Sequence, residues 1–188
     1  MDEVRIIEKP DSISYEEIQG LLRRAHEANA AKGLLYATAN QSVEKLIAKI
    51  GKGTCYVAMV SEDEKDVLAG TVTVCPVSLN YWYHSGEVAL IKLLGVDPKY
   101  KGRKIGTLLI EQCLAYAKEI AVDVIVADSA EENITLYNLL KKFDFELVDY
   151  CKYPQNNFVT AVYAHFVKAP LWDDARRKEM LEMKRASL

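Results

Sequence analysis

The chain has 188 residues, half of them hydrophobic and 27% charged, with a formal net charge of −3 and a pI near 5.7. This composition is typical of a globular protein and excludes an intrinsically disordered one. The weakly acidic balance gives no global reason to expect nucleic acid or an anionic membrane as a partner. The length predicts a single domain, residues 1–188, with a core from about 4 to 166 and a helical extension from about 170 to 188.

The start of the sequence lacks an apolar signal core, and no stretch reaches about 18 consecutive apolar residues. We therefore expect a cytoplasmic protein that does not enter a membrane. The four cysteines contain no CxxC pair and have no histidine cluster beside them, which excludes the usual zinc spacings and argues against a disulfide framework. We expect no metal, and we expect core positions for Cys55, Cys75, Cys113 and Cys151.

The first half of the chain predicts a strand, two helices and a hairpin. Residues 4–8 alternate weakly as a strand, and Ser14 with Glu17 forms a capping box that opens a helix closed by Gly33. The further elements are a short helix over 43–50 that ends at Gly51, and β-rich runs over 54–60 and 67–77 around a charged turn.

The second half predicts a β-helix-β unit followed by further alternation. The expected elements are a strand over 87–96, a helix over 103–120, a strand over 122–127, a helix over 130–143 opened by a capping box of Ser129 and Glu132, and strands over 146–153 and 158–166. A last helix is expected from Leu171 onward, started by Pro170, with Asp173 and Asp174 in its first turn and Trp172 as an anchor. The order βααβββαβαββ predicts an α/β fold with a mixed sheet flanked by helices.

The turn between the strand over 87–96 and the following helix is crowded with positive charge. Lys99, Lys101, Arg103 and Lys104 place four cations in six residues at a helix start, where backbone N–H groups already favour an anion. A solvated loop is the alternative interpretation of such a run. Its position, after a strand and before a helix with a strongly apolar face, supports a phosphate site as strongly as it supports a solvated loop.

At these residues the chain resembles the GNAT superfamily of acetyl-CoA-dependent N-acetyltransferases. The resemblance lies in Val96-Asp97-Pro98 followed by Lys101-Gly102-Arg103-Lys104-Ile105-Gly106. Lys101 stands where the family has Gln or Arg, and Lys104 stands where it usually has its first glycine. The element order matches the family over about residues 4–166, and the motifs lie within 90–145.

The resemblance implies acetyl-CoA as co-substrate, with splayed parallel strands that receive its pantetheine arm. Backbone N–H groups of the turn, with the Thr107 hydroxyl, would hold the pyrophosphate. The main chain near Leu94 to Val96 would pair with pantetheine, and an N–H near Leu93 or Leu94 would polarise the thioester carbonyl. The implied coenzyme-binding residues are Leu94, Gly95, Val96, Lys101, Gly102, Arg103, Lys104, Ile105, Gly106, Thr107 and Asn133.

Two residues are candidates for proton transfer. Glu87 is the leading candidate for the general base, with an exposed strand-end charge as the alternative. His84, in an expected loop, would line the acceptor cleft or else be a solvated loop histidine. The family's tyrosine acid falls on Leu140 in register, so Tyr137, one helical turn earlier, would replace it or else be a packed core residue. Asn133 would contact CoA or serve as a capping residue, and Asp144 replaces the family glycine in a left-handed turn.

Acceptor specificity is expected to lie in the first two helices and in two aromatic segments, 79–86 and 150–158. These aromatic residues would form an apolar or cationic pocket, or simply core and dimer contacts: Tyr81, Trp82, Tyr83, Tyr150, Tyr153 and Phe158. The resulting hypothesis is an N-acetyltransferase that acts on a small-molecule or peptide amine by direct attack in a ternary complex, with a homodimer left open. A CoA-binding module without transfer activity is the alternative.

Overall fold

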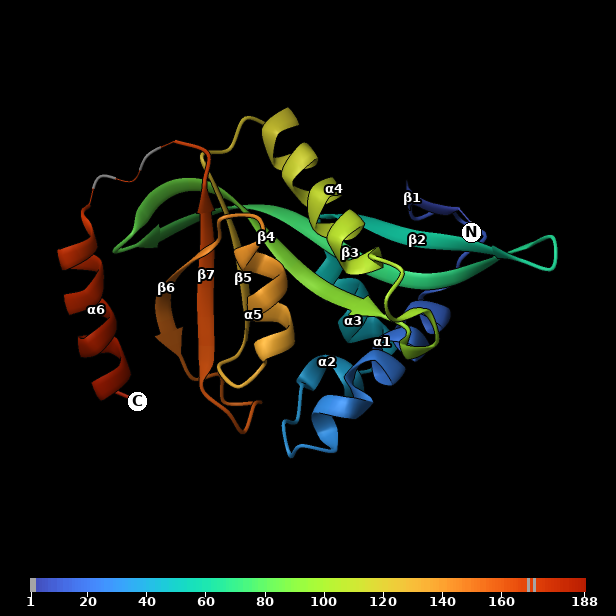
Figure 1. Cartoon of the computed structure of the whole chain (residues 1–188), viewed down its shortest axis with the longest axis horizontal. Helices are drawn as coiled ribbons and strands as arrows, with labels where there is room; N and C mark the ends of the chain where they lie inside the picture. The colour runs from blue at the N-terminus through green and yellow to red at the C-terminus, as the bar shows by residue number, and fades with distance from the viewer. Residues whose placement is uncertain (1–2, 169, 171) are drawn as a thin grey trace. The chain divides into compact units, whose positions relative to one another are not determined.

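The computed structural model describes residues 3–168, 170 and 172–188, without the side chain of residue 79 (Figure 1). The chain divides into two compact units. The first combines Met1–Cys75 with Ile91–Tyr116, and the second combines Pro76–Leu90 with Ala117–Leu188. The expectation of a single domain therefore stays a prediction.

The first unit is built on antiparallel strands in the order β1-β2-β3-β4. These strands are β1 (Val4–Glu8), β2 (Thr54–Glu62), β3 (Lys65–Tyr81) and β4 (His84–Val96), of which β3 and β4 also enter the second unit. The predicted first strand and hairpin are confirmed. The hairpin turn is only Asp63 and Glu64, whose φ values of 47° and 62° are those of a primed two-residue turn that suits twisted strands.

Helices cover both faces of these strands. The helices of this unit are α1 (Tyr15–Ala30), α2 (Ala37–Asn40), α3 (Val43–Ile50) and α4 (Ile105–Glu119). α1 and α3 share a buried cluster with alternate residues of β2, such as Val57 and Met59. Side chains alternate along a strand, so the residues between them, Tyr56 and Ala58, face α4 instead.

Two glycines let helices lie close to the strands. A Cβ on Gly70 of β3 would come within 2.8 Å of Ile105 Cγ2, and one on Gly95 of β4 would come within 2.9 Å of Leu22 Cδ2. Contacts that short are repulsive, so a side chain at Gly70 would push against α4, whereas one at Gly95 would first require the end of the Leu22 side chain to shift. The sheet therefore fixes how deeply α1 and α4 are seated.

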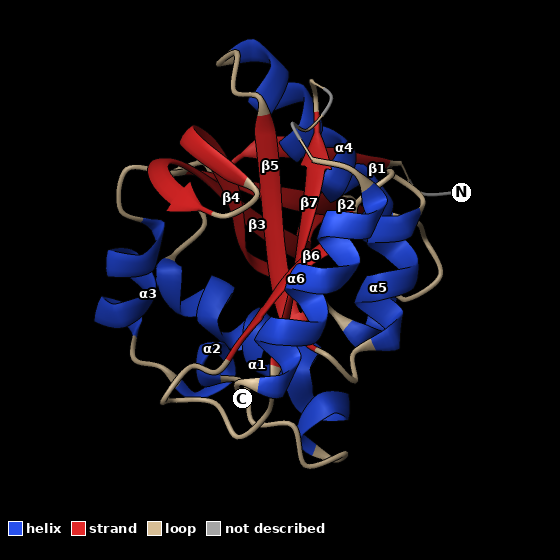
Figure 2. Ribbon diagram, turned by 90° about the vertical axis from the view of Figure 1, so that its left-hand side faces the viewer, coloured by secondary structure: helices blue, strands red, loops and turns tan. Residues whose placement is uncertain are grey.

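In the second unit the strand order is β4-β5-β7-β6, and β7 pairs antiparallel with both of its neighbours. Its elements are β5 (Val124–Ala130), α5 (Ile134–Lys141), β6 (Glu146–Cys151), β7 (Thr160–Phe166) and α6 (Asp174–Ala186). α6 lies beside β6, as Figure 2 shows with helices in blue and strands in red. Val88, Val124, Val126, Val148 and Val162 are members of its core.

Two predicted helix starts in this unit are wrong. Ser129 and Glu132 do not form a capping box, because β5 pairs with β7 as far as Ala130 and α5 begins only at Ile134 with Asn133 as its cap. α6 begins at Asp174 and not at residue 171, and the Asp173 side chain accepts the hydrogen bond from Arg176 N. Leu171 itself lies outside the described residues.

The expected loop over 79–86 is also wrong, because the β3–β4 hairpin continues through it. Only Trp82 and Tyr83 form the turn, and His84 is already the first residue of β4. Tyr83 is 4% exposed and belongs to the core of the second unit. Cross-strand pairing and burial thus extend the strands beyond the residues that their sequence pattern marks.

All four cysteines are free thiols; three are buried and Cys151 is half-buried. Among the described residues no helix is both long and apolar enough to cross a bilayer. No group of three or more His, Cys, Asp or Glu side chains in that part of the chain is placed to hold a metal ion.

Candidate functional site

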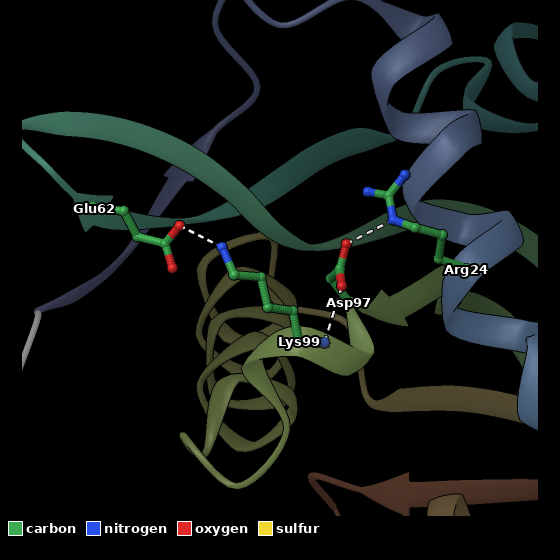
Figure 3. Close-up of polar contacts among 4 residues, drawn as sticks. All are labelled: Arg24, Glu62, Asp97 and Lys99. Atoms are coloured by element: carbon green, nitrogen blue, oxygen red, sulfur yellow. Dashed lines mark hydrogen bonds and ion pairs between the residues drawn. The ribbon is translucent and has the colours of Figure 1, made fainter.

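A short 3-10 helix, η1 (Pro98–Tyr100), connects β4 to the turn that precedes α4, and Asp97 anchors it. The Asp97 backbone N–H donates to Ala69 O of β3 at 2.9 Å. Its Oδ1 accepts from Lys99 N at 3.0 Å, and its Oδ2 accepts from Arg24 Nε of α1 at 2.7 Å (Figure 3). Asp97 is 9% exposed, and it ties the turn to a strand through its backbone N–H and to a helix through its carboxylate.

Lys99 fixes the other side of the turn. Its Nζ lies 2.6 Å from Glu62 Oε2 at the end of β2, and this hydrogen bond lowers the pKa of the Glu62 carboxyl (Figure 3). Lys99 and Arg103 also lie over the ring of Tyr100, with 5.1 and 5.5 Å to its centroid. Tyr100 is only 2% exposed and anchors the turn in the core. Lys99 therefore helps to hold the turn in place.

The backbone between Tyr100 and α4 leaves several donors open. Lys101 N and Arg103 N donate to carbonyl oxygens within the turn, at 3.2 and 3.3 Å. Within the described part of the chain, no hydrogen bond uses the backbone N–H of the remaining residues, which are Gly102, Lys104, Ile105, Gly106 and Thr107. Unpaired N–H groups at a helix start form an anion site.

The conformation of this turn explains how bulky side chains fit there. Gly102 has φ 88° and Lys104 has φ 59°. Lys104 stands where the resembled family usually has glycine, and its left-handed backbone is the conformation that glycine adopts without strain. The Lys104 side chain is exposed, and Ile105 is 2% exposed and fixes the first turn of α4. The turn thus keeps at Lys104 the left-handed backbone conformation that glycine usually supplies.

A second residue with an unusual backbone conformation lies near the end of β4. Leu93 has φ 54°, although it is a non-glycine residue inside a strand, and its side chain is 7% exposed in the cluster with α1. A left-handed leucine is strained by about 1–2 kcal/mol. Such a break turns the amides of neighbouring residues out of the regular ladder. Nothing in the sequence pattern predicts it.

The second unit holds the other candidates, of which Asn133 is engaged in local structure. Its Oδ1 accepts from Leu136 N at 3.2 Å, and its Nδ2 donates to Ser129 Oγ at 3.0 Å. The capping interpretation is thus correct. A contact with CoA stays a prediction.

Tyr137 and Leu140, the two positions considered for the acid, differ in burial. Leu140, in register with the family's tyrosine, is fully buried. Tyr137 is 36% exposed, so it is not a packed core residue, and its ring centroid lies 5.9 Å from that of Tyr163. A role for Tyr137 in proton transfer stays a prediction.

Glu87 is an exposed residue of β4, and its carboxylate accepts a hydrogen bond from the Ser78 hydroxyl of β3. His84, the candidate for lining the acceptor cleft, is half-buried at the start of the same strand. The candidates thus fall into two groups. Leu94 through Thr107 belong to the first unit, whereas Glu87, Asn133 and Tyr137 belong to the second.

Sequence reasoning missed the residues that hold the turn. An aspartate before a proline is typical of a helix cap, so Asp97 had a readable signal. Arg24 and Glu62 lie 73 and 37 residues from their partners, and their pairing depends on the fold alone.

Residues 16–145 match the model of the acetyltransferase (GNAT) family. No curated protein matches the chain. Similar solved structures include a GNAT-family acetyltransferase from Staphylococcus aureus, with 18% identity and a TM-score of 0.65 over 88% of this chain and 100% of that one. NAA60 of Arabidopsis thaliana, in complex with a bisubstrate analogue, has 18% identity and a TM-score of 0.66 over the same shares.

A third structure, the NatC complex bound to Gag peptide and CoA, has 14% identity and a TM-score of 0.66 over 88% of this chain and 99% of that chain. These likenesses show the fold, an α/β arrangement with a mixed sheet flanked by helices. Since the family model spans most of the sequence, the chain belongs to the acetyltransferase (GNAT) family.

Proposed function

We propose that the protein transfers an acetyl group from acetyl-CoA to an amine by direct attack in a ternary complex. The amine nitrogen forms a bond to the thioester carbonyl carbon and loses a proton, and the carbon–sulfur bond breaks as CoA leaves as a thiolate that takes up a proton. No covalent enzyme intermediate is needed. In support, Cys113 is deeply buried, which raises the pKa of its thiol to about 12 and makes it a poor nucleophile.

The observation that carries the proposal is the set of unpaired N–H groups at Gly102 and at Lys104 through Thr107. Several parallel donors at one helix start suit a diphosphate, which offers many acceptor oxygens and two or more negative charges. Lys101 and Lys104, both exposed at the same turn, add positive charge. The Asp97 and Lys99 contacts keep this backbone in place before the ligand arrives.

The strained backbone at Leu93 supports a role in the chemical step. A donor near Leu93 or Leu94 would stabilise the negative charge that develops on the thioester oxygen during attack. Removal of one such donor costs about 3–4 kcal/mol of transition-state stabilisation in acyl-transfer enzymes. Strain held at one position by a packed core is a known way to preorganise such a group.

Glu87 and Tyr137 are the side chains that we propose for proton transfer. Glu87 would receive the amine proton, directly or through water, since a primary amine with a pKa near 10 is protonated at neutral pH. Tyr137 would donate to the departing thiolate. A thiol pKa is about 8.5, so the thiolate leaves well even unaided, and the acid is expected to contribute modestly.

A CoA-binding module without transfer activity is the second candidate. The observation that favours it is the buried Leu140, which leaves the family's acid position without a hydroxyl. Such a protein would bind CoA and release none from acetyl-CoA in the presence of any amine.

One pair of measurements distinguishes the two candidate functions. Calorimetry with CoA tests the binding site, and release of free CoA thiol from acetyl-CoA across a panel of amines tests transfer. We expect micromolar binding and amine-dependent release. Binding without release would select the second candidate, and the absence of binding by folded protein would refute both.

A further inference from the structure

A groove of about 580 Å³ lies between α1 and the start of β3, within the first unit. This volume is in the range of small-ligand sites. Side chains alternate along a strand, so Asp66 and Leu68 project toward α1, and the Lys65 side chain projects away from it. The residues that line the groove from the side of α1 are Ile13, Glu16, Glu17, Gly20 and Arg24.

Gly20 lies in the interior of α1, and nothing in the packing of the described residues requires a glycine there. Outside the helix backbone, a Cβ at Gly20 would meet one atom within 4 Å, Arg24 Nη1 at 3.5 Å, which is an ordinary contact distance. Glycine is, after proline, the least favourable residue in a helix interior. The groove gives a reason for the missing side chain, because a larger residue would project into it.

Arg24 offers unused donors to the groove. Its Nε donates to Asp97 Oδ2 at 2.7 Å, and its two terminal nitrogens point away from Asp97 (Figure 3). One of these nitrogens lies beside Gly20, and no hydrogen bond within the described residues uses either of them. A guanidinium held through Nε presents its terminal N–H groups as a fork, which matches the two oxygens of a carboxylate.

Carboxylates lie one helical turn before Gly20, at the other end of this face. Glu16 is exposed and has no ion pair or hydrogen bond among the described residues, and Glu17 keeps its charge while it serves in the helix cap. Asp66 is neutralised by Arg5, whose Nη2 lies 2.5 Å from its Oδ2. A simple anion would be repelled by the glutamates and a simple cation by the guanidinium, so the groove suits a ligand that carries both charges.

We propose that this groove binds a zwitterion of dipeptide length, with its ammonium group at Glu16 and Glu17 and its carboxylate at Arg24. Residues three and four apart on a helix have Cβ atoms about 5–6 Å from each other, and the Arg24 fork reaches back to Gly20. An extended chain advances about 3.3–3.6 Å per residue, so two residues bridge this separation and one does not. Leu68 adds apolar surface for a side chain. The inference goes beyond the proposed function and does not depend on it.

The test uses calorimetry with glycyl-leucine on the full chain without coenzyme. N-acetylglycyl-leucine lacks the ammonium group and glycyl-leucinamide lacks the carboxylate, while both keep the leucine side chain. We expect each blocked compound to bind about tenfold more weakly than glycyl-leucine, as the loss of one charge-assisted contact provides. Free leucine should also bind more weakly, because it is too short. Equal affinities of the free and blocked dipeptides, or no binding of glycyl-leucine, would overturn the proposal.

Two variants locate the binding. Gly20→Leu should abolish it by filling the groove, while raising the thermal midpoint by about 2 °C because leucine is the better helix former. Glu16→Gln should weaken binding about tenfold, whereas the matched control Glu27→Gln, exposed on the same helix outside the groove, should not change it. Unchanged binding in Gly20→Leu, or equal effects of the two glutamate variants, would refute the assignment.

The proposed function is tested separately on the same proteins. CoA binding and amine-dependent release of CoA from acetyl-CoA read the turn before α4, and glycyl-leucine binding without coenzyme reads the groove. A parent protein that binds glycyl-leucine and fails to bind CoA would retain this inference and lose the proposed function. The reverse result would lose the inference alone.

Discussion

The N-termini of α1 and α4, two helices of the same unit, are built in opposite ways. At α1 the Ser14 hydroxyl accepts from Glu17 N at 3.2 Å, and the Glu17 carboxylate accepts in return from Ser14 N at 2.7 Å. At α4 the preceding residue is Lys104, whose side chain cannot accept a hydrogen bond, and the first N–H groups are unpaired within the described residues.

The difference teaches what each terminus is for. Side-chain caps close α3, α5 and α6 as well, through Ser42, Asn133 and Asp173. A missing cap costs a helix about 1 kcal/mol. The four-residue α2 has no side-chain cap either, but of the longer helices it is α4 whose first N–H groups stay open among the described residues, where an anion can replace the cap. Substitutions at either N-terminus test this difference in role.

Lys104→Asp should have the largest effect. It reverses a charge beside the proposed diphosphate and should weaken CoA binding about thirtyfold, or by roughly 2 kcal/mol. Calorimetry measures the affinity. Lys118→Asp, at the exposed last turn of the same helix, is the control with the same charge change, and it should leave the affinity unchanged. An equal loss in both variants would mean that only net charge matters.

Gly102→Ala should separate binding from stability. A Cβ at Gly102 or at Gly33 meets no atom within 4 Å, and the φ values are 88° and 81°, so each substitution adds backbone strain without a clash. Both should lower the free energy of unfolding by about 1 kcal/mol in denaturant titrations. Only Gly102→Ala should also weaken CoA binding, by about tenfold, since its strain shifts the open amides. Equal affinities would place the coenzyme elsewhere.

Ser14→Ala tests the closed terminus. It removes the hydroxyl that accepts from Glu17 N and should lower the free energy of unfolding by about 1 kcal/mol, while CoA binding stays as in the parent protein. A loss of CoA affinity with unchanged stability would contradict the division of roles between the two helices.

The smallest expected effect is a pH dependence of the same cap. Hydrogen bonds from the Ser14 backbone N–H, and then from its hydroxyl, hold the pKa of the Glu17 carboxyl below its ordinary value. A carboxyl with a lowered pKa stabilises the fold above its ordinary pKa, and this stabilisation is lost as the pH falls through the lowered value. Glu17→Gln should thus be less stable than the parent at pH 7, by a few tenths of a kcal/mol for an exposed group. The difference should vanish in strong acid, and a constant difference would contradict the mechanism.

Local signals in the sequence predicted much of the fold. The capping box at Ser14, the end of α3 at Gly51 and the left-handed Asp144, with φ 55°, all depend on neighbours in the chain and were predicted correctly. The same kind of signal gave a wrong capping box at Ser129, because Ser129 and Ala130 pair with β7 as part of β5 and do not start a helix. The four residues of α2 are too few for a periodic pattern.

The candidate site was predictable only where it is continuous in sequence. The turn from Lys101 to Thr107 was found because its residues are adjacent. The left-handed Leu93 and the Arg24 contact to Asp97 follow from packing, which joins residues far apart in the chain.

Because Gly70 has no side chain, the middle of β3 helps to set the position of the proposed anion site at the start of α4. The first turn of α4 rests on that bare backbone through Ile105 and Leu109, so a single added methyl group there would lift the helix start and carry its amides outward with it. A buried substitution at Gly70 would then lower the affinity for the coenzyme. Residues that do not contact the ligand can therefore change its binding.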